Sequence, residues 1–253
     1  MADVVLTTVE GGVATVSFNR PEKLNAMGAE TTPAMHAALT ELAHRDDVRA
    51  VVLTGEGTSF STGLDLESDF GGDVQSTYVR MRESVATILL LREMPQPVIA
   101  AVHGNAVGGG FAYAVACDMR IVGTDARFIA PFASIGMSAG DLGLTWLLPR
   151  MIGPGAAAKV FYTAEPLNAE TALQLGLAEE VVDDPRARAL EIAEKIASKP
   201  AFGVRHSKEL LNASIYGQGF REHLEVELRS QVVCSMSSDF TEAKARFSER
   251  RRK

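Results

Sequence analysis

One segment constrains the fold of this chain more than any other. Residues 98–117 contain no Asp, Glu, Lys or Arg. A helix of that length would cross a bilayer. However, the segment holds four glycines, among them the adjacent Gly108, Gly109 and Gly110, and no basic cluster flanks it. The pattern therefore predicts a buried strand, a glycine turn and a buried helix rather than a membrane insertion.

The rest of the chain alternates strand and helix patterns before it becomes wholly helical. Two β-branched runs flank Gly11 and Gly12 and predict a hairpin. Further strands are expected at 48–54, 98–102 and 119–122, and helices around 35–42 and at 78–91. From about Arg186 helices alone are expected, at 186–198, 202–212, 219–236 and 240–250. We predict an α/β core over residues 1–190 and a helical region over residues 191–253.

Composition excludes several classes of function. The formal net charge of −7 argues against binding nucleic acid through its phosphates. The two cysteines, Cys117 and Cys234, cannot form a disulfide framework or a zinc site by themselves. No two of the five histidines are spaced as a helical metal pair, so we expect no metal. No signal peptide is visible, and together with the cysteine usage this predicts a cytoplasmic protein.

Two short motifs are ambiguous when taken alone. The triple glycine could bring a ligand close to backbone N–H groups at a helix N-terminus, or it could serve close helix–strand packing. Residues 136–140 match the G-x-S-x-G nucleophile elbow of serine hydrolases. A serine hydrolase is disfavoured because a poor helix start follows Ser138, and His206 and His223 lie in the helical tail.

The combination of motifs is far more specific than any one of them. Four blocks occur in order: NRPEKLNAM at 19–27, VRAVVLTG at 48–55, FSTGLDL at 60–66, and PVIAAVHG at 97–104 leading into the triple glycine and Cys117-Asp118. In this order and spacing they resemble the crotonase (enoyl-CoA hydratase/isomerase) superfamily. The resemblance extends from about residue 4 to about residue 250.

The resemblance implies a fold and a mechanism. Crotonase-like proteins have a ββα spiral core with a helical C-terminal region for oligomerisation, and they assemble as trimers or as hexamers made of two trimers. They bind acyl-CoA thioesters and hold an enolate oxyanion with two backbone N–H groups, which here would belong to Leu64 and Gly109. Preorganised backbone dipoles suit that role because they face the charge that develops on the thioester oxygen. No separate cofactor is implied, since coenzyme A is part of the substrate.

The acid–base residues depart from the hydratase pattern. Its two glutamates are replaced here by Ala112 and Phe132. Asp141 begins a segment similar to one in the phenylacetate-pathway isomerase, and an Asp at the matching place in dienoyl-CoA isomerases takes part in proton transfer. The alternative for Asp141 is a turn residue between Gly140 and Gly143. A single carboxylate can carry a proton between two carbons, so we expect a catalytic Asp141 and a double-bond shift.

The resemblance also implies a set of residues that bind the substrate and its CoA. They are Arg20, Lys23, Leu24, Ser61, Thr62, Gly63, Asp65, Gly108, Phe132, Phe247 and Arg250. The last two would reach the CoA of a neighbouring subunit, because they occupy a Phe and a basic position of the family's last helix. We therefore expect an enoyl-CoA isomerase. The alternatives are a hydratase that uses Asp141 and water, and an acyl-CoA-binding protein with little activity.

Overall fold

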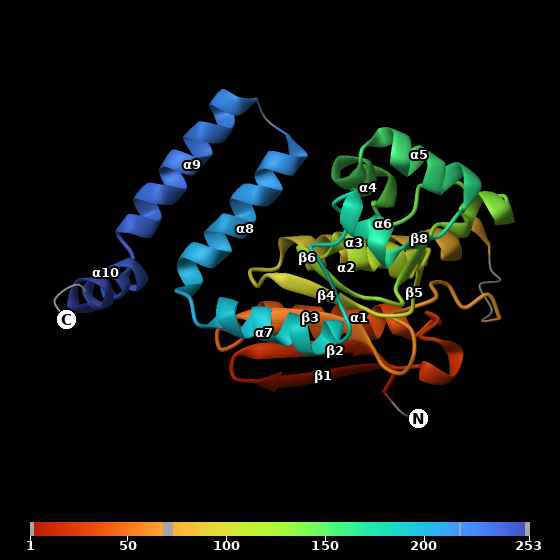
Figure 1. The fold of residues 1–253 in the computed structure, drawn as a ribbon, viewed down its shortest axis with the longest axis horizontal. Helices are drawn as coiled ribbons and strands as arrows, with labels where there is room; N and C mark the ends of the chain where they lie inside the picture. Colours follow the sequence, from red (N-terminus) through yellow and green to blue (C-terminus); the bar gives the residue numbers. More distant parts are fainter. Residues whose placement is uncertain (1–2, 68–72, 218, 251–253) are drawn as a thin grey trace.

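The computed structural model describes residues 3–67, 73–217 and 219–250, with side chains as far as residue 244 (Figure 1). The strands are β1 (Val5–Glu10), β2 (Val13–Phe18), β3 (Ala50–Gly55), β4 (Val98–Val102), β5 (Asn105–Val107), β6 (Met119–Gly123), β7 (Arg127–Ile129), β8 (Leu167–Asn168) and β9 (Glu180–Val182). The α-helices are α1 (Thr31–Ala43), α2 (Val74–Glu93), α3 (Gly109–Ala116), α4 (Leu144–Ile152), α5 (Pro154–Thr163), α6 (Ala169–Gln174), α7 (Pro185–Ala197), α8 (Ala201–Tyr216), α9 (Phe220–Ser235) and α10 (Ser238–Arg250). Short 3-10 helices span η1 (Pro21–Lys23) and η2 (Pro131–Ile135).

The main sheet of the described chain has the strand order β1-β2-β3-β4-β6-β9. The β1–β2 pair is antiparallel, as the predicted hairpin requires, and each later pair is parallel. Every residue of β2, β3 and β4 is buried. This burial explains why the sequences of these strands are almost continuously apolar and do not alternate between apolar and polar residues.

The two faces of this sheet are covered by different helices. Alternate strand residues such as Val52, Ile99 and Ile121 pack against Ala189 and Ala193 of α7. The residues between them join the larger cluster formed with α1, α2 and α3. Because side chains on a strand alternate between faces, the apolar strands can be buried on both sides at once. The prediction of an α/β class with parallel pairing is confirmed.

The uncharged segment folds as strand, turn and helix. It forms β4, then β5, and then α3, whose residues are all buried. Strand β5 belongs to a small second sheet of order β5-β7-β8, which the sequence patterns did not predict. Within the described residues, no helix is long and apolar enough to cross a membrane.

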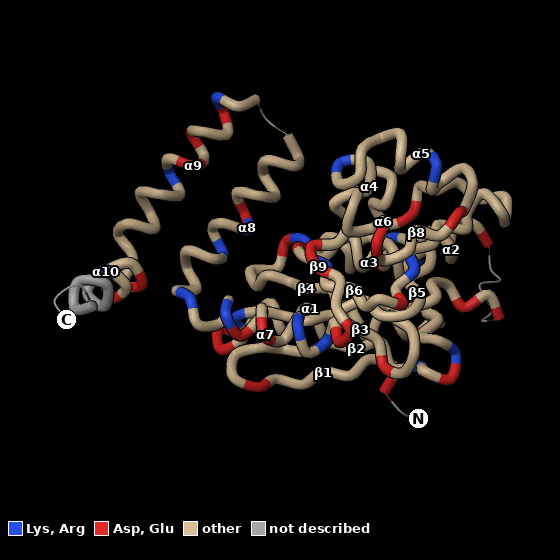
Figure 2. The backbone as a smooth tube through the Cα atoms, in the orientation of Figure 1, with Lys and Arg blue, Asp and Glu red and all other residues tan. Residues whose placement is uncertain are grey.

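The C-terminal helices differ from the core in their placement. Helix α7 lies against the main sheet, whereas α8 and α9 run side by side as a helical hairpin beside the core, with α10 at the end opposite the α8–α9 turn (Figure 1). Acidic and basic residues are interspersed along α8 and α9 (Figure 2). The four expected C-terminal helices are present, with ends that differ by a few residues from the predicted ones.

Candidate active site

The glycine turn between β5 and α3 exposes a backbone N–H group. Gly108 has φ 52° and ψ −115°, a conformation open to glycine but strained for other residues. A Cβ on Gly110 would lie 2.4 Å from the Ser61 carbonyl oxygen, so this position has no space for a side chain. Helix α3 therefore begins at Gly109, whose N–H belongs to the first turn and has no acceptor within the helix.

A second segment lies directly beside this turn. The Ser61 N–H donates to Asn105 O at 3.0 Å, and the Val107 N–H donates to Ser61 O at 2.9 Å. A Cβ on Gly63 would be 2.5 Å from Val107 O and 3.2 Å from the Gly109 nitrogen. This packing places the backbone that leads into Leu64 against the N-terminus of α3.

Leu64 and Gly109 lie on the wall of the same cavity. Leu64 forms an isolated parallel bridge with Met27, in which the N–H groups of Met27 and Asp65 donate and that of Leu64 does not. Both Leu64 and Gly109 line a cavity of about 310 Å³. The structure thus brings to one cavity the two residues whose N–H groups were expected to form the oxyanion hole, and that role stays a prediction. Such a pair can stabilise a developing negative charge on a ligand oxygen.

Asp141 lines the same cavity. Its backbone carbonyl accepts from the Leu144 N–H at 2.8 Å, and Leu142 has φ 47°, so the main chain forms a turn here. The residue nevertheless borders the cavity and is half-buried. Burial raises the pKa of the Asp141 carboxyl above its ordinary value. The two interpretations of Asp141 are therefore compatible, because its backbone forms the turn while its side chain remains available for chemistry.

The two positions that carry glutamates in hydratases are apolar here. Ala112 is 1% exposed and packs in the main core cluster. Phe132 lies in η2 and borders the cavity, and a Cβ on Gly108 would be 3.9 Å from its ring. Neither side chain can transfer a proton, and the Phe132 ring makes that wall of the cavity apolar.

Several of the predicted CoA-binding residues hold the loop beside the cavity. Arg20 donates to Asp65 at 2.9 Å and to Ala26 O at 2.7 Å, while Lys23 lies 3.6 Å from Asp65 and 2.9 Å from Glu67. Burial of Asp65 opposes its ionisation, but the hydrogen bond from Arg20 and the charge of Lys23 outweigh it, so its pKa is lowered. The Arg20 guanidinium is thus engaged within the protein, and a contact with CoA stays a prediction.

The remaining predicted contacts lie along the same loop. Leu24 is half exposed, and its carbonyl accepts from the Thr62 N–H at 3.1 Å. The Ser61 hydroxyl donates to Asn25 O at 2.8 Å. Phe247 and Arg250 fall in the last turns of α10, where their side chains lie outside the described residues.

Several polar residues of the cavity wall were not found from the sequence, among them Thr32 on α1, Glu83 on α2 and Tyr113 on α3. The motif comparison considered only the positions where hydratases carry their acid–base groups, and Tyr113 is one residue beyond such a position. Ser138 of the hydrolase-like motif is exposed, with no strand before it and no helix directly after it. The nucleophile elbow is therefore not formed.

Comparison with known proteins agrees with this geometry. A family model described as enoyl-CoA hydratase/isomerase matches residues 8–253. A probable enoyl-CoA hydratase of Mycobacterium bovis is 34% identical over 251 residues, which covers 94% of this chain and 87% of the relative. The 1,2-epoxyphenylacetyl-CoA isomerase of Escherichia coli is 32% identical over 259 residues, covering 98% and 96%.

A solved structure extends the likeness to three dimensions. The enoyl-CoA hydratase of Bacillus anthracis matches with a TM-score of 0.93 at 30% identity, and the match covers 98% of this chain and 96% of that one. The matching fold, the family model and the paired N–H groups lead to one conclusion. This chain is an enzyme of the enoyl-CoA hydratase/isomerase family, with the crotonase fold.

Proposed function

We propose that this enzyme shifts a carbon–carbon double bond in an enoyl-CoA thioester. The observation that carries the proposal is the set of groups around the cavity: two backbone N–H groups, one half-buried carboxylate at Asp141, and apolar residues at both hydratase positions. The related proteins support the family but not this choice, since they include hydratases and an isomerase.

The proposed reaction needs one base that both removes and returns a proton. The Asp141 carboxylate takes a proton from C2 of a 3-enoyl thioester, and the electron pair moves onto the thioester oxygen. The N–H groups of Leu64 and Gly109 hold the resulting dienolate. The protonated Asp141 then gives the proton to C4, which leaves a 2-enoyl thioester. A raised pKa makes Asp141 a better proton acceptor than an exposed aspartate, and the Phe132 ring disfavours a bound water.

Hydration is the second candidate, and one observation favours it. Glu83 on α2 is exposed but also borders the cavity, so two carboxylates line this space. Two carboxylates could divide water activation and carbon protonation between them. Under the isomerase proposal, replacement of Glu83 by Gln leaves the double-bond shift in place. Under the hydratase alternative it removes most of the activity.

The test compares two substrates and two variants. The purified enzyme is given a 3-enoyl-CoA and, separately, a 2-enoyl-CoA, and the products are separated by chromatography. We expect conversion of the 3-enoyl ester and little 3-hydroxyacyl product. Asp141→Asn should lower isomerisation by about 10²–10⁴-fold while ester binding is retained. Hydration at about 1–10³ s⁻¹ would contradict the proposal, and binding without any turnover would favour the third alternative, a binding protein.

Self-association is proposed as part of the same function. Helices α8 to α10 expose large apolar side chains that the core does not cover, among them Phe220, Leu228 and Met236. Exposed apolar patches of this kind mark interaction surfaces. We expect a trimer or a hexamer of two trimers, in which the last helix lies close to the CoA of a neighbouring subunit.

A further inference from the structure

Tyr113 carries a hydroxyl group that the protein itself does not use. The residue lies in α3 and is 1% exposed, and its ring packs edge-on against Phe18 at a centroid distance of 5.4 Å. It also borders the cavity that Asp141 and the oxyanion N–H groups line. Within the described part of the chain, the Tyr113 hydroxyl has no hydrogen-bond partner.

Two threonine hydroxyls are the polar neighbours of the phenol. Those of Thr87 and Thr32 lower its pKa as weak hydrogen-bonding neighbours do, but neither lies at the distance and angle of an ordinary hydrogen bond. The Thr87 hydroxyl donates to Glu83 O at 2.9 Å and lies 3.2 Å from His36 Nδ1. Thr32 is itself a wall residue of the cavity. A buried hydroxyl without a partner is costly, and a phenylalanine would fill the same space without that cost.

The chemical state of this group is well defined. Burial raises the pKa of the Tyr113 phenol well above its ordinary value. The nearby Thr87 and Thr32 hydroxyls oppose this shift, and the Asp141 charge adds to it. Tyr113 therefore remains protonated at neutral pH and is a neutral hydrogen-bond donor. Its surroundings at the cavity include the apolar side chains of Met27, Phe132 and Leu142.

We propose that Tyr113 is a specificity-determining residue that donates a hydrogen bond to an oxygen atom carried by the acyl group of the substrate. The preferred class is an acyl-CoA thioester with a carbonyl or hydroxyl oxygen on its chain, over a plain hydrocarbon chain of equal length. A single donor in a mainly apolar cavity discriminates strongly, because it stays unpaired when a hydrocarbon chain is bound. The inference rests on the proposed function only in that an acyl-CoA occupies this cavity, whichever reaction follows.

The test uses saturated esters, so that binding is measured without turnover. Affinities of hexanoyl-CoA and of 3-oxo-, 4-oxo- and 5-oxohexanoyl-CoA are measured by calorimetry for the wild type and for Tyr113→Phe. The wild type should bind at least one oxo ester about 5- to 150-fold more tightly than hexanoyl-CoA. Tyr113→Phe should lose that preference and bind hexanoyl-CoA at least as tightly as the wild type does.

A matched variant and a stability measurement complete the design. Tyr162→Phe, on an exposed tyrosine of α5, should leave all four affinities unchanged. Tyr113→Phe should unfold at the same temperature as the wild type or higher, since it removes an unpaired hydroxyl. A lower unfolding temperature would overturn the proposal, because it would reveal a structural partner for the phenol.

The remaining outcomes separate this inference from the proposed function. If the wild type binds hexanoyl-CoA but none of the oxo esters more tightly, the role of Tyr113 is wrong and the acyl-CoA assignment stands. That role is equally wrong if Tyr113→Phe keeps the preference for an oxo ester. If no CoA ester binds to the wild type, the proposed function fails, and the inference fails with it.

Discussion

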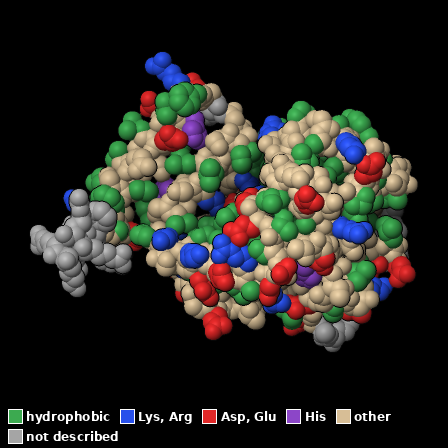
Figure 3. Space-filling view, in the orientation of Figure 1, with side chains coloured by type: hydrophobic (Ala, Val, Ile, Leu, Met, Phe, Trp, Pro, Cys, Tyr) green, Lys and Arg blue, Asp and Glu red, His purple; other side chains and the backbone are tan. Residues whose placement is uncertain are grey.

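The core and the C-terminal helices are stabilised in opposite ways. Among the described residues, every buried apolar side chain lies at or before Ala193, and beyond it the one buried residue is Lys208. Many hydrophobic side chains are exposed on α8 and α9, and they lie among polar ones in the left part of the view in Figure 3. The core therefore buries its apolar side chains within itself, whereas the helical hairpin leaves many of its apolar side chains exposed.

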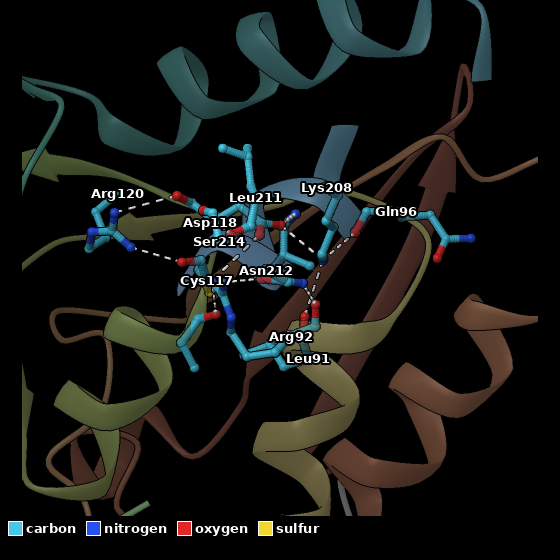
Figure 4. Close-up of polar contacts among 12 residues, drawn as sticks. Leu91, Arg92, Gln96, Cys117, Asp118, Arg120, Lys208, Leu211, Asn212 and Ser214 are labelled. Atoms are coloured by element: carbon cyan, nitrogen blue, oxygen red, sulfur yellow. Dashed lines mark hydrogen bonds and ion pairs between the residues drawn. The ribbon is translucent and has the colours of Figure 1, made fainter. Parts of the chain in front are cut away.

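Polar contacts link α8 to the core (Figure 4), in addition to the packing of Ile215 against the main apolar cluster. Lys208 lies 2.9 Å from Asp118 and donates to Gln96 O at 2.8 Å and Leu91 O at 3.3 Å. One and two turns further on, Asn212 and Tyr216 accept from Arg92, which also lies 3.6 Å from Asp118. The spacing of four residues places all three α8 side chains on one face of that helix.

Because of this difference, we expect substitutions in the two regions to affect different properties of the protein. The core fixes the backbone groups of the cavity by dense packing, so small changes there can alter chemistry without unfolding the chain. The helical hairpin depends on a few polar groups and on whatever covers its apolar face. Changes there should affect docking and assembly first.

Among the changes that compare these two regions, the largest effect is expected from removing one N–H group in the core. Gly109→Pro deletes the donor at the first position of α3, where a helix tolerates proline well. The loss of one oxyanion donor typically lowers turnover by about 10²–10³-fold. The measurement is the steady-state rate on the preferred enoyl-CoA, together with the unfolding temperature.

The matched control for this variant keeps the N–H group. Gly109→Ala introduces the same Cβ, which would lie 2.4 Å from the flexible end of Met27, but it retains the donor. Any loss that Gly109→Ala shares with Gly109→Pro reports crowding rather than the missing donor. Equal rates for the two variants would remove Gly109 from the oxyanion hole.

The next largest effect is expected where the helical hairpin meets the core. Lys208→Met keeps the apolar stem but removes the charge beside Asp118. Breaking a fully buried ion pair costs about 3–5 kcal/mol, and we expect about 2–3 kcal/mol here. The smaller figure follows because the Asp118 side chain is 21% exposed and still faces Arg92. Urea unfolding, with protease cleavage near residues 198–201 as a local readout, measures the effect.

An exposed lysine provides the comparison for Lys208. Lys159 on α5 pairs with Glu165 at 2.8 Å, but its side chain is 69% exposed. Lys159→Met should change the free energy of unfolding by less than about 0.5 kcal/mol, as is typical of surface positions. If both lysine variants behave alike, the polar contacts of α8 do not hold the hairpin to the core.

A smaller effect is expected from removing the last helix, which lies at the end of the hairpin opposite the α8–α9 turn. Deletion of residues 240–253 removes most of α10 but keeps Asp239, which accepts from the Phe202 N–H at 3.1 Å. CoA-ester affinity should fall about tenfold, the loss of one charged hydrogen bond, and the oligomer should loosen. Sedimentation at micromolar concentration checks the assembly. A full-length protein that sediments as a monomer would show that the assembly proposal is wrong.

The same contrast explains what the sequence could predict. Buried strands such as β3 and β4 give strong patterns, because burial on both faces requires uninterrupted apolar residues. The place of Leu64 and Gly109 at the cavity was predictable from motif order, because their proposed roles depend on backbone shape and not on side chains. The short strands β5, β7 and β8 have two or three residues each and leave no recognisable period.

The cavity wall was harder to predict than the oxyanion pair. Tyr113 and Thr32 come from helices that are distant in sequence, and only the packing of α1 against α2 and α3 brings them to one space. Arg20 was expected to contact CoA, yet it binds Asp65, a pairing across 45 positions that no local pattern signals. Long-range polar partners of this kind are visible only in the folded chain.

The smallest effect is expected from the charge of Asp141 on stability. Because burial raises the pKa of this carboxyl in the folded state, the unfolded chain loses the proton at a lower pH than the folded chain. The folded state then binds more protons across that interval, so the contribution of Asp141 to stability falls as the pH rises through it. Asn cannot ionise and avoids this cost.

Asp141→Asn should therefore be more stable than the wild type at pH 7, and the difference should shrink as the pH falls from the raised pKa of the folded state towards the ordinary pKa of an aspartate. Urea midpoints for both proteins at pH 7 and pH 4 measure it. The opposite sign at pH 7 would mean that the carboxylate is held by a stabilising partner, and it would then be poorly suited to move a proton. Gain of stability with loss of turnover is the combination expected of a group kept for chemistry at the expense of the fold.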